Sequence, residues 1–97
     1  MRLDIFLKYT GLIKQRNQAK RACDQGNVVI INGDGKRSAK AGQSVHVGER
    51  ICIQLTTRRI EIEVLKLPHR APSKKDRLQL YRQISEVIIE PYSDLSF

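Results

Sequence analysis

The sequence predicts a small α+β domain in which an N-terminal hairpin of two helices packs on a small, mostly antiparallel sheet and is joined by a C-terminal helix. Three patterns support this prediction. Apolar residues recur at helical spacing before residue 25, two later segments alternate between apolar and polar residues, and the turn-forming pair Asn32-Gly33 separates the two halves. A chain of 97 residues is long enough to bury one core.

Two short helices are expected in the first 25 residues. Apolar residues at helical spacing mark the first one: Leu3, Phe6 and Leu7. Thr10-Gly11 should interrupt it, and a second helix should run from about Arg16 to Gln25. Small residues would face the core from this second helix: Ala19, Ala22 and Cys23. Gly26 should end it as a left-handed cap, so that the two helices form a hairpin.

Strands are expected after the helices. The β-branched run from Val28 to Ile31 predicts a first strand, closed by the Asn32-Gly33 turn. A further short strand is expected around Ser44 to Val47. Alternating apolar residues predict an antiparallel hairpin between residues 51–55 and 60–64, with one face of it buried.

The remaining residues are expected to add a linker and a helix. Residues 1–67 would form the main domain, and residues 68–97 would pack on or beside it. Pro68 to Ser73 has the composition of a linker. Apolar residues mark the expected C-terminal helix, which should end before Pro91: Leu78, Leu80, Tyr81, Ile84 and Val87.

The charge distribution favours a polyanionic partner. The chain has 18 Lys and Arg against 10 Asp and Glu, a net charge of +8, and neutralising phosphates releases condensed counterions. Residues 1–21 hold six of these cations and one acid, Asp4, whereas residues 83–97 hold three acids and no Lys or Arg. The binding face should therefore be N-terminal. An anionic membrane would attract the same excess, so the sign of the charge alone does not choose the partner.

Several classes of site and location are disfavoured by the sequence. Cys23 and Cys52 form no Cys-x-x-Cys pair and have no His at ligand spacing, so we expect packing thiols in a reducing compartment, with no metal and no cofactor. The longest apolar run, Val28 to Ile31, is too short to span a bilayer, and the N-terminus has no signal-peptide pattern. We expect a cytoplasmic protein without a membrane partner.

Specific residues occupy this order of elements: Arg2-Leu3-Asp4-x-Phe6-Leu7, Arg16-x-x-Ala19-Lys20, Gly26-x-Val28 and Ile31-Asn32-Gly33. From Met1 to about Leu55 the chain resembles the S-four RNA-binding domain family, whose fold is built on the alpha-L motif. Over nearly its whole length it is similar to the bacterial ribosome-associated quality-control family RqcP, which is related to the fifteen-kilodalton heat-shock S-four proteins. The family usually has Ser or Thr where this chain has Gln15. The second helix of this chain should therefore be less stable at its N-terminus, by about 1 kcal/mol.

The resemblance implies a role in protein biosynthesis. It implies binding to the large ribosomal subunit when a stalled nascent chain remains attached to transfer RNA, with contacts to ribosomal RNA and transfer RNA, in support of non-templated alanine addition. A quality-control partner protein on the ribosome is also implied. The protein itself is expected to be a monomer and to have no catalytic role.

A set of cationic and polar residues is expected to bind the RNA: Arg2, Lys8, Lys14, Arg16, Gln18, Lys20, Arg21, Lys36 and Arg37. Arg16 and Lys20 are four residues apart, so they share a helix face, and Arg2 would lie beside them. Asp4 would either orient one of the arginines or only favour the helix N-terminus by its charge. For each of these residues a solvated surface role is the simpler alternative.

The same sequence features allow other functions. A related S-four protein could bind another structured RNA, as a heat-shock ribosome-recycling or assembly factor. Two short helices could also form a DNA-binding helix-turn-helix, but the strand directly after them argues against it. An enzyme is disfavoured because no phosphate-cradling loop or nucleophile with a base is recognisable. Glu61 and Glu63, which alternate on one strand, are expected to lie on a solvated face.

Overall fold

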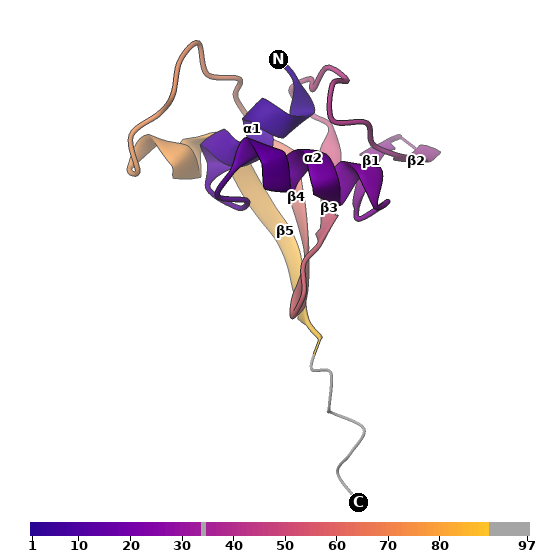
Figure 1. Cartoon of the computed structure of the whole chain (residues 1–97). Helices are drawn as coiled ribbons and strands as arrows, with labels where there is room; N and C mark the ends of the chain where they lie inside the picture. The colour runs from indigo at the N-terminus through magenta and orange to yellow at the C-terminus, as the bar shows by residue number, and fades with distance from the viewer. Residues whose placement is uncertain (34, 90–97) are drawn as a thin grey trace, which may run out of the picture.

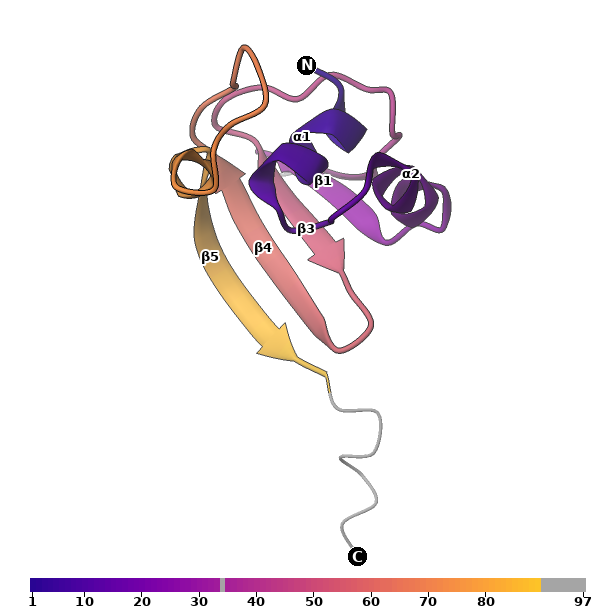
Figure 2. The same cartoon turned by 60° about the vertical axis from the view of Figure 1, so that its left-hand side comes forward.

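A computed structural model describes residues 1–33 and 35–89. The elements follow in the order α1 (Leu3–Thr10), α2 (Arg16–Asp24), β1 (Val28–Asn32), β2 (Gly35–Ser38), β3 (Arg50–Gln54), β4 (Arg58–Val64), the 3-10 helix η1 (Asp76–Gln79) and β5 (Tyr81–Ile88). Both α-helices lie on the same face of the sheet, as Figures 1 and 2 show. The predicted α+β fold with a helix hairpin on an antiparallel sheet is confirmed.

Within the described residues, the sheet has five antiparallel strands in the order β2-β1-β3-β4-β5. The expected hairpin is β3–β4, in which Ile51 is opposite Ile62 and Ile53 is opposite Ile60. All four of these side chains are buried against the helices, because residues two apart on a strand share a face. The neighbouring polar residues, such as Glu61, point to the other face.

Helix packing follows the apolar pattern of the sequence. Leu3, Phe6 and Leu7 of α1 are fully buried, and α2 contributes Ala19 and Cys23 to the same core. Gly26 has a φ of +78°, as expected of a glycine that ends a helix in the left-handed region. Burial, followed by the charges of Asp4 and Asp24, raises the pKa of the Cys23 thiol to about 11. None of the helices in the described ranges is long and apolar enough to cross a membrane.

The prediction of a C-terminal helix is wrong. Residues 81–88 form β5, which pairs along its length with β4, and only a 3-10 helix of four residues precedes it. The apolar residues do fit helical spacing, but Leu78, Ile84 and Val87 are exposed, so no helix face is buried. Pairing with β5 satisfies the backbone groups of β4, which would otherwise form an open edge. Pro91, where the helix was expected to end, lies outside the described residues.

A second correction concerns the connection between β1 and β3. The strand expected around Ser44 to Val47 is reduced to a single bridge between Ser44 and Arg2. The strand in this region is β2 instead, paired with β1 from Val29 opposite Ser38 to Asn32 opposite Gly35. Local sequence favoured a turn after β1, but the polar residues of β2, all exposed, gave no alternating pattern.

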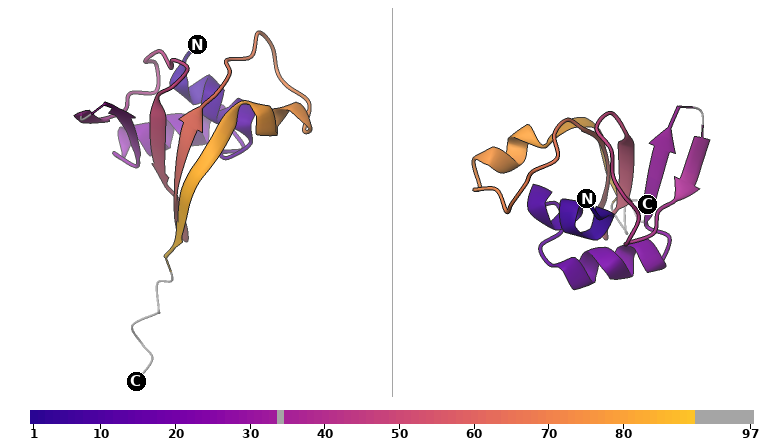
Figure 3. Two further views of the ribbon diagram at one scale, coloured as in Figure 1. Left: turned by 180° about the vertical axis from the view of Figure 1, so that it is seen from behind. Right: turned by 90° about the horizontal axis from the view of Figure 1, so that it is seen from above.

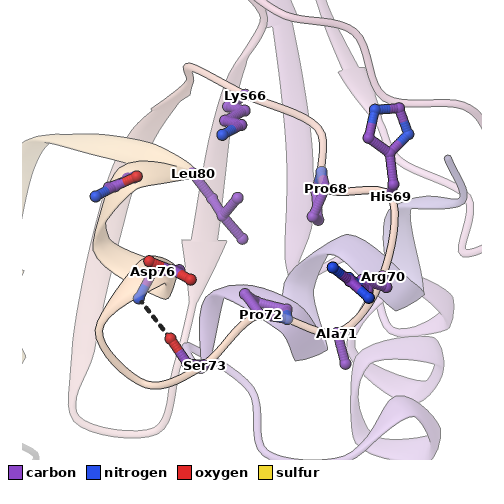
Figure 4. A pocket seen from close by; sticks show the side chains of 10 residues that line it. Lys66, Pro68, His69, Arg70, Ala71, Pro72, Ser73, Asp76 and Leu80 are labelled. Carbon is purple, nitrogen blue, oxygen red and sulfur yellow. Dashed lines mark hydrogen bonds between the residues drawn. The ribbon is translucent and has the colours of Figure 1, made fainter.

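Residues 66–79 form a long loop beside the C-terminal end of α1, and we call it the basic loop. It has one acidic residue, Asp76, and five cationic residues: Lys66, Arg70, Lys74, Lys75 and Arg77. The backbone N–H groups of Leu65 and Lys66 both donate to the carbonyl of Leu80, at 2.8 and 3.2 Å, and close the base of the loop. The linker predicted from Pro68 to Ser73 forms the outer part of this loop, drawn in Figure 4.

Candidate nucleic-acid interface

Asp4 is the centre of the cationic face on the helix hairpin. Its side chain is 1% exposed and accepts hydrogen bonds from Nε and Nη2 of Arg2, at 3.1 and 3.2 Å. Its Oδ2 also accepts a hydrogen bond from Nε of Arg16 at 3.1 Å. One carboxylate of α1 therefore holds two arginines, one before α1 and one at the start of α2. The orienting role considered for Asp4 from the sequence is the arrangement found.

The electrostatics of Asp4 favour its charged form. Burial alone would raise the pKa of the Asp4 carboxyl, but the hydrogen bonds and charges of Arg2 and Arg16 outweigh it, so the pKa is lowered. The same contact raises the pKa of Arg2. About half of each arginine side chain remains exposed, 48% for Arg2 and 51% for Arg16. Both guanidinium groups are thus fixed at one edge and open to a ligand at another.

The first turn of α1 is fixed by the loop that precedes β3. The N–H of Leu3 donates to the carbonyl of Gln43 at 2.9 Å, and the N–H of Asp4 donates to that of Ala41 at 3.1 Å. These bonds replace the side-chain cap that Arg2 does not provide. The guanidinium of Arg2 lies over Gly42, with Cζ and both Nη atoms 3.5 Å from where a Cβ would be. Backbone hydrogen bonds and the packing of the Arg2 side chain on Gly42 therefore both fix the start of α1 against this loop.

Lys20 lies one turn after Arg16 on α2 and is exposed, so these two cations share one side of the helix. Gln18 and Arg21 are also exposed, but they project away from the side buried by Ala19 and Cys23. The structure therefore groups Arg2, Arg16 and Lys20, which we call the hairpin face. It does not bring Gln18 or Arg21 into that group.

Lys36 and Arg37 lie on β2 and are exposed. The β1–β2 hairpin and the basic loop are at opposite ends of the helix pair, as the view from above in Figure 3 shows. Arg37 lines a separate hollow with Gln43, His46 and Glu49. This second cationic cluster is therefore separated from the basic loop by the helix pair.

Lys8 and Lys14 line a cleft at the other end of the helix pair. Tyr9 and Gly11 contribute to this cleft from the same region, and Ala71, Pro72 and Arg77 contribute from the basic loop. The set predicted from the sequence includes the two lysines but not Arg77, because nothing in local sequence places residue 77 beside residues 8 and 14. The closure of a long loop brings them together.

Glu61 and Glu63 lie on the face of the sheet that points away from the helices. Glu61 pairs with Arg50 at 3.2 Å, and Glu63 pairs with Arg82. Each carboxylate thus has a structural partner on an exposed surface. Within residues 1–33 and 35–89, no three His, Cys, Asp or Glu side chains gather as a metal site would require.

Comparison with known proteins identifies the family. The sequence model of the S4 domain family, which is the S-four family named above, matches residues 1–51 of this chain. The RQC P-site tRNA stabilizing factor of Halalkalibacterium halodurans is 41% identical over 64 residues, which cover 66% of this chain and 68% of that protein. The factor of the same name from Bacillus subtilis is 34% identical over 86 residues, 89% of this chain and 94% of that protein.

A solved structure extends the likeness to three dimensions. The trimeric structure of Vibrio cholerae heat shock protein 15 matches with a TM-score of 0.77 and 27% identity, over 88% of this chain and 82% of that one. The helix hairpin, the sheet and the residues that join them thus follow a known arrangement. On these matches, the chain belongs to the S4 domain family and, within it, to the bacterial RQC P-site tRNA stabilizing factors.

Proposed function

We propose that the protein binds RNA on the large ribosomal subunit during ribosome-associated quality control. It contacts ribosomal RNA and the transfer RNA of a stalled nascent chain, and it thereby supports addition of alanine to that chain. It acts by binding and not by catalysis, as a monomer in the cytoplasm. The observation that carries the proposal is the pair of arginines held by the buried carboxylate of Asp4, in a chain whose relatives are named for stabilising transfer RNA.

The geometry of the hairpin face supports RNA as the ligand. Proteins recognise folded RNA mainly through its shape, its phosphates and its 2′-hydroxyl groups. Arg2 and Arg16 offer planar donors that can hold a phosphate by two parallel hydrogen bonds, and Lys20 adds a point charge. Because Asp4 already orients both arginines, little side-chain freedom is lost when RNA binds.

The remaining residues of the predicted set have peripheral parts in this proposal. Lys8 and Lys14 extend the cationic surface along the helix hairpin toward the basic loop. Gln18, Arg21, Lys36 and Arg37 would contact only more distant parts of a large RNA. A quality-control partner protein on the ribosome would bind a surface that these residues leave free.

The proposal is tested by sucrose-gradient sedimentation of the tagged full chain from bacterial cells, with sequencing of the bound RNA. Arg16→Ala should reduce co-sedimentation with large subunits by about tenfold, the effect of losing roughly 1.4 kcal/mol of binding free energy. Arg59→Ala is the matched control, because Arg59 is an exposed arginine of β4 on the far face of the sheet, bonded only to Gln54 in the described structure. Equal behaviour of the two variants would contradict the proposal.

A second candidate is a heat-shock or assembly factor of the S4 family that binds another structured RNA. The match to heat shock protein 15 over 88% of the chain favours it. The same gradient separates the two candidates. Enrichment of large subunits that carry transfer RNA supports the quality-control role, and enrichment of other RNA, with the same dependence on Arg16, supports the second.

A further inference from the structure

The cleft between α1 and the basic loop contains three cations from three separate segments. Lys8 comes from the last turn of α1, Lys14 from the connection to α2, and Arg77 from η1. Tyr9, Ala71 and Pro72 supply its less polar lining, and no acidic residue lines it. In the described parts of the chain, none of the three cations forms an ion pair, whereas Arg2, Arg16, Arg50, Arg58 and Arg82 all do.

Arg77 is held in this cleft by packing and not by a hydrogen bond from its Nε. That atom is buried and has no acceptor among the described residues. A Cβ at Gly11 would lie 3.1 Å from Nη1 of Arg77, so the guanidinium rests directly on the glycine backbone. Three cations therefore line one cleft without an ion-pair partner among the described residues, so an anion bound between them would be attracted by all three charges.

The basic loop is built to keep Arg77 in place. The N–H groups of Asp76 and Arg77 both donate to the carbonyl of Ser73, at 3.1 Å, and Oγ of Ser73 accepts a further bond from the N–H of Asp76 at 3.3 Å, shown in Figure 4. Leu80, which follows η1, is buried at 2% exposure and accepts the bonds that close the loop. The turn that carries Arg77 is thus fixed at both ends.

We propose that this cleft binds a phosphate of an RNA backbone between Lys8, Lys14 and Arg77, with the adjoining sugar or base packed on Tyr9 and Pro72. The inference rests on the proposed function and adds a second contact to it. Arg2 directly precedes α1 and Lys8 lies in its last turn, so one RNA strand can meet both sites along the helix. The basic loop lies beyond residues 1–51, the part of the chain that matches the S4 domain.

The test measures the affinity of the full chain for transfer RNA by fluorescence anisotropy across a range of salt concentrations. Lys14→Gln and Arg77→Gln should each weaken binding by about tenfold and reduce the slope of log affinity against log salt by roughly one phosphate contact. Lys74→Gln is the matched control, since it removes one charge from the same loop outside the cleft. It should change the affinity by about twofold or less.

Each outcome decides between the two proposals. If Arg16→Ala weakens binding while both cleft variants behave like Lys74→Gln, the cleft proposal is overturned and the proposed function stands. If the wild-type chain binds an acidic peptide as well as it binds transfer RNA, both are overturned. Arg77→Lys should bind more tightly than Arg77→Gln, because it keeps the positive charge. Lys14 is exposed, so Lys14→Gln tests the cleft without disturbing the loop. A folding defect in Arg77→Gln therefore does not decide the result.

Discussion

Asp4 shows how a buried carboxylate can orient the exposed side chains around it. Its carboxylate is inaccessible, yet the orientation of Arg2 and Arg16 depends on it. In addition, Oδ1 accepts a hydrogen bond from the N–H of Ile5 at 2.8 Å. The carboxylate is thus a positioning group for the hairpin face and part of the first turn of α1.

Asp4→Asn should weaken RNA binding even though it makes the protein more positive. Charge alone predicts tighter binding for this variant, whereas loss of orientation at Arg2 and Arg16 predicts an affinity lower by about tenfold, or roughly 1.4 kcal/mol. Anisotropy titrations with transfer RNA measure the change. Asp24→Asn serves as the control, because it removes an exposed acid near the other end of α2. Tighter binding by Asp4→Asn would reject the orienting role.

Asp4 should also make the free energy of unfolding depend on pH in the acidic range. Its pKa is lowered in the folded protein from an ordinary value of 3.8. The stabilisation is therefore fully present above that value and is lost as the pH falls through the folded pKa. Urea unfolding between neutral pH and about pH 2 should show a smaller loss of unfolding free energy in Asp4→Asn than in the wild type. Parallel pH curves for the two proteins would contradict this assignment.

At the scale of the elements, α2 begins without help from its first side chain. Gln15 occupies the N-cap position with extended backbone angles but makes no side-chain cap bond, as its residue type predicts. Gln15→Ser should therefore stabilise the protein by about 1 kcal/mol, because the hydroxyl can accept a bond from the free N–H groups of the first turn. Thermal unfolding measures the gain. Gln15→Ala, which cannot cap, should show none of it.

Gly11 and Gly26 differ in what surrounds them although both have a φ of +78°. A Cβ at Gly26 would meet nothing within 4 Å, whereas one at Gly11 would press on Arg77. Gly26→Ala should cost roughly 1 kcal/mol of stability from backbone strain alone and leave transfer RNA binding unchanged. Gly11→Ala should lower both stability and affinity. Denaturation and anisotropy on the same samples separate the two effects.

The elements also show where local sequence is informative. The helix hairpin and the β3–β4 hairpin were predictable because each buries one face, so apolar spacing records the structure directly. β5 was mistaken for a helix because it is an edge strand exposed on both faces, and its few apolar residues, such as Ile84 and Val87, carry no alternation. β2 was missed for the same reason.

At the scale of the whole molecule, the site depends on contacts between distant segments. The grouping of Arg2, Arg16 and Lys20 was predictable, since helix periodicity and a short connection bring them together. The approach of Arg77 to Lys8 and Lys14 was not, since it depends on how a 14-residue loop, 66–79, closes on Leu80. The composition of residues 68–73 predicts only a linker for its outer part.

The dependence of RNA affinity on salt should reflect both sites together. If Arg2, Arg16 and Lys20 each meet a phosphate and the three cleft cations together hold one more, log affinity should fall with log salt at a slope of about −3 to −4. Combining Arg16→Ala with Lys14→Gln should reduce that slope by the sum of the single changes. A wild-type slope near −1 would show that most of these cations do not meet RNA.

The ion pairs on the outer face of the sheet have a consequence for the encounter between protein and RNA. Arg50 and Arg82 are already neutralised there by Glu61 and Glu63, whereas Lys8, Lys14 and Arg77 on the helix side have no such partner in the described chain. Unpaired positive charge is therefore concentrated on the helix side of the molecule. The electric field of a polyanion should rotate the protein until its helices face the polyanion before contact. Fewer orientations then have to be sampled, which raises the association rate.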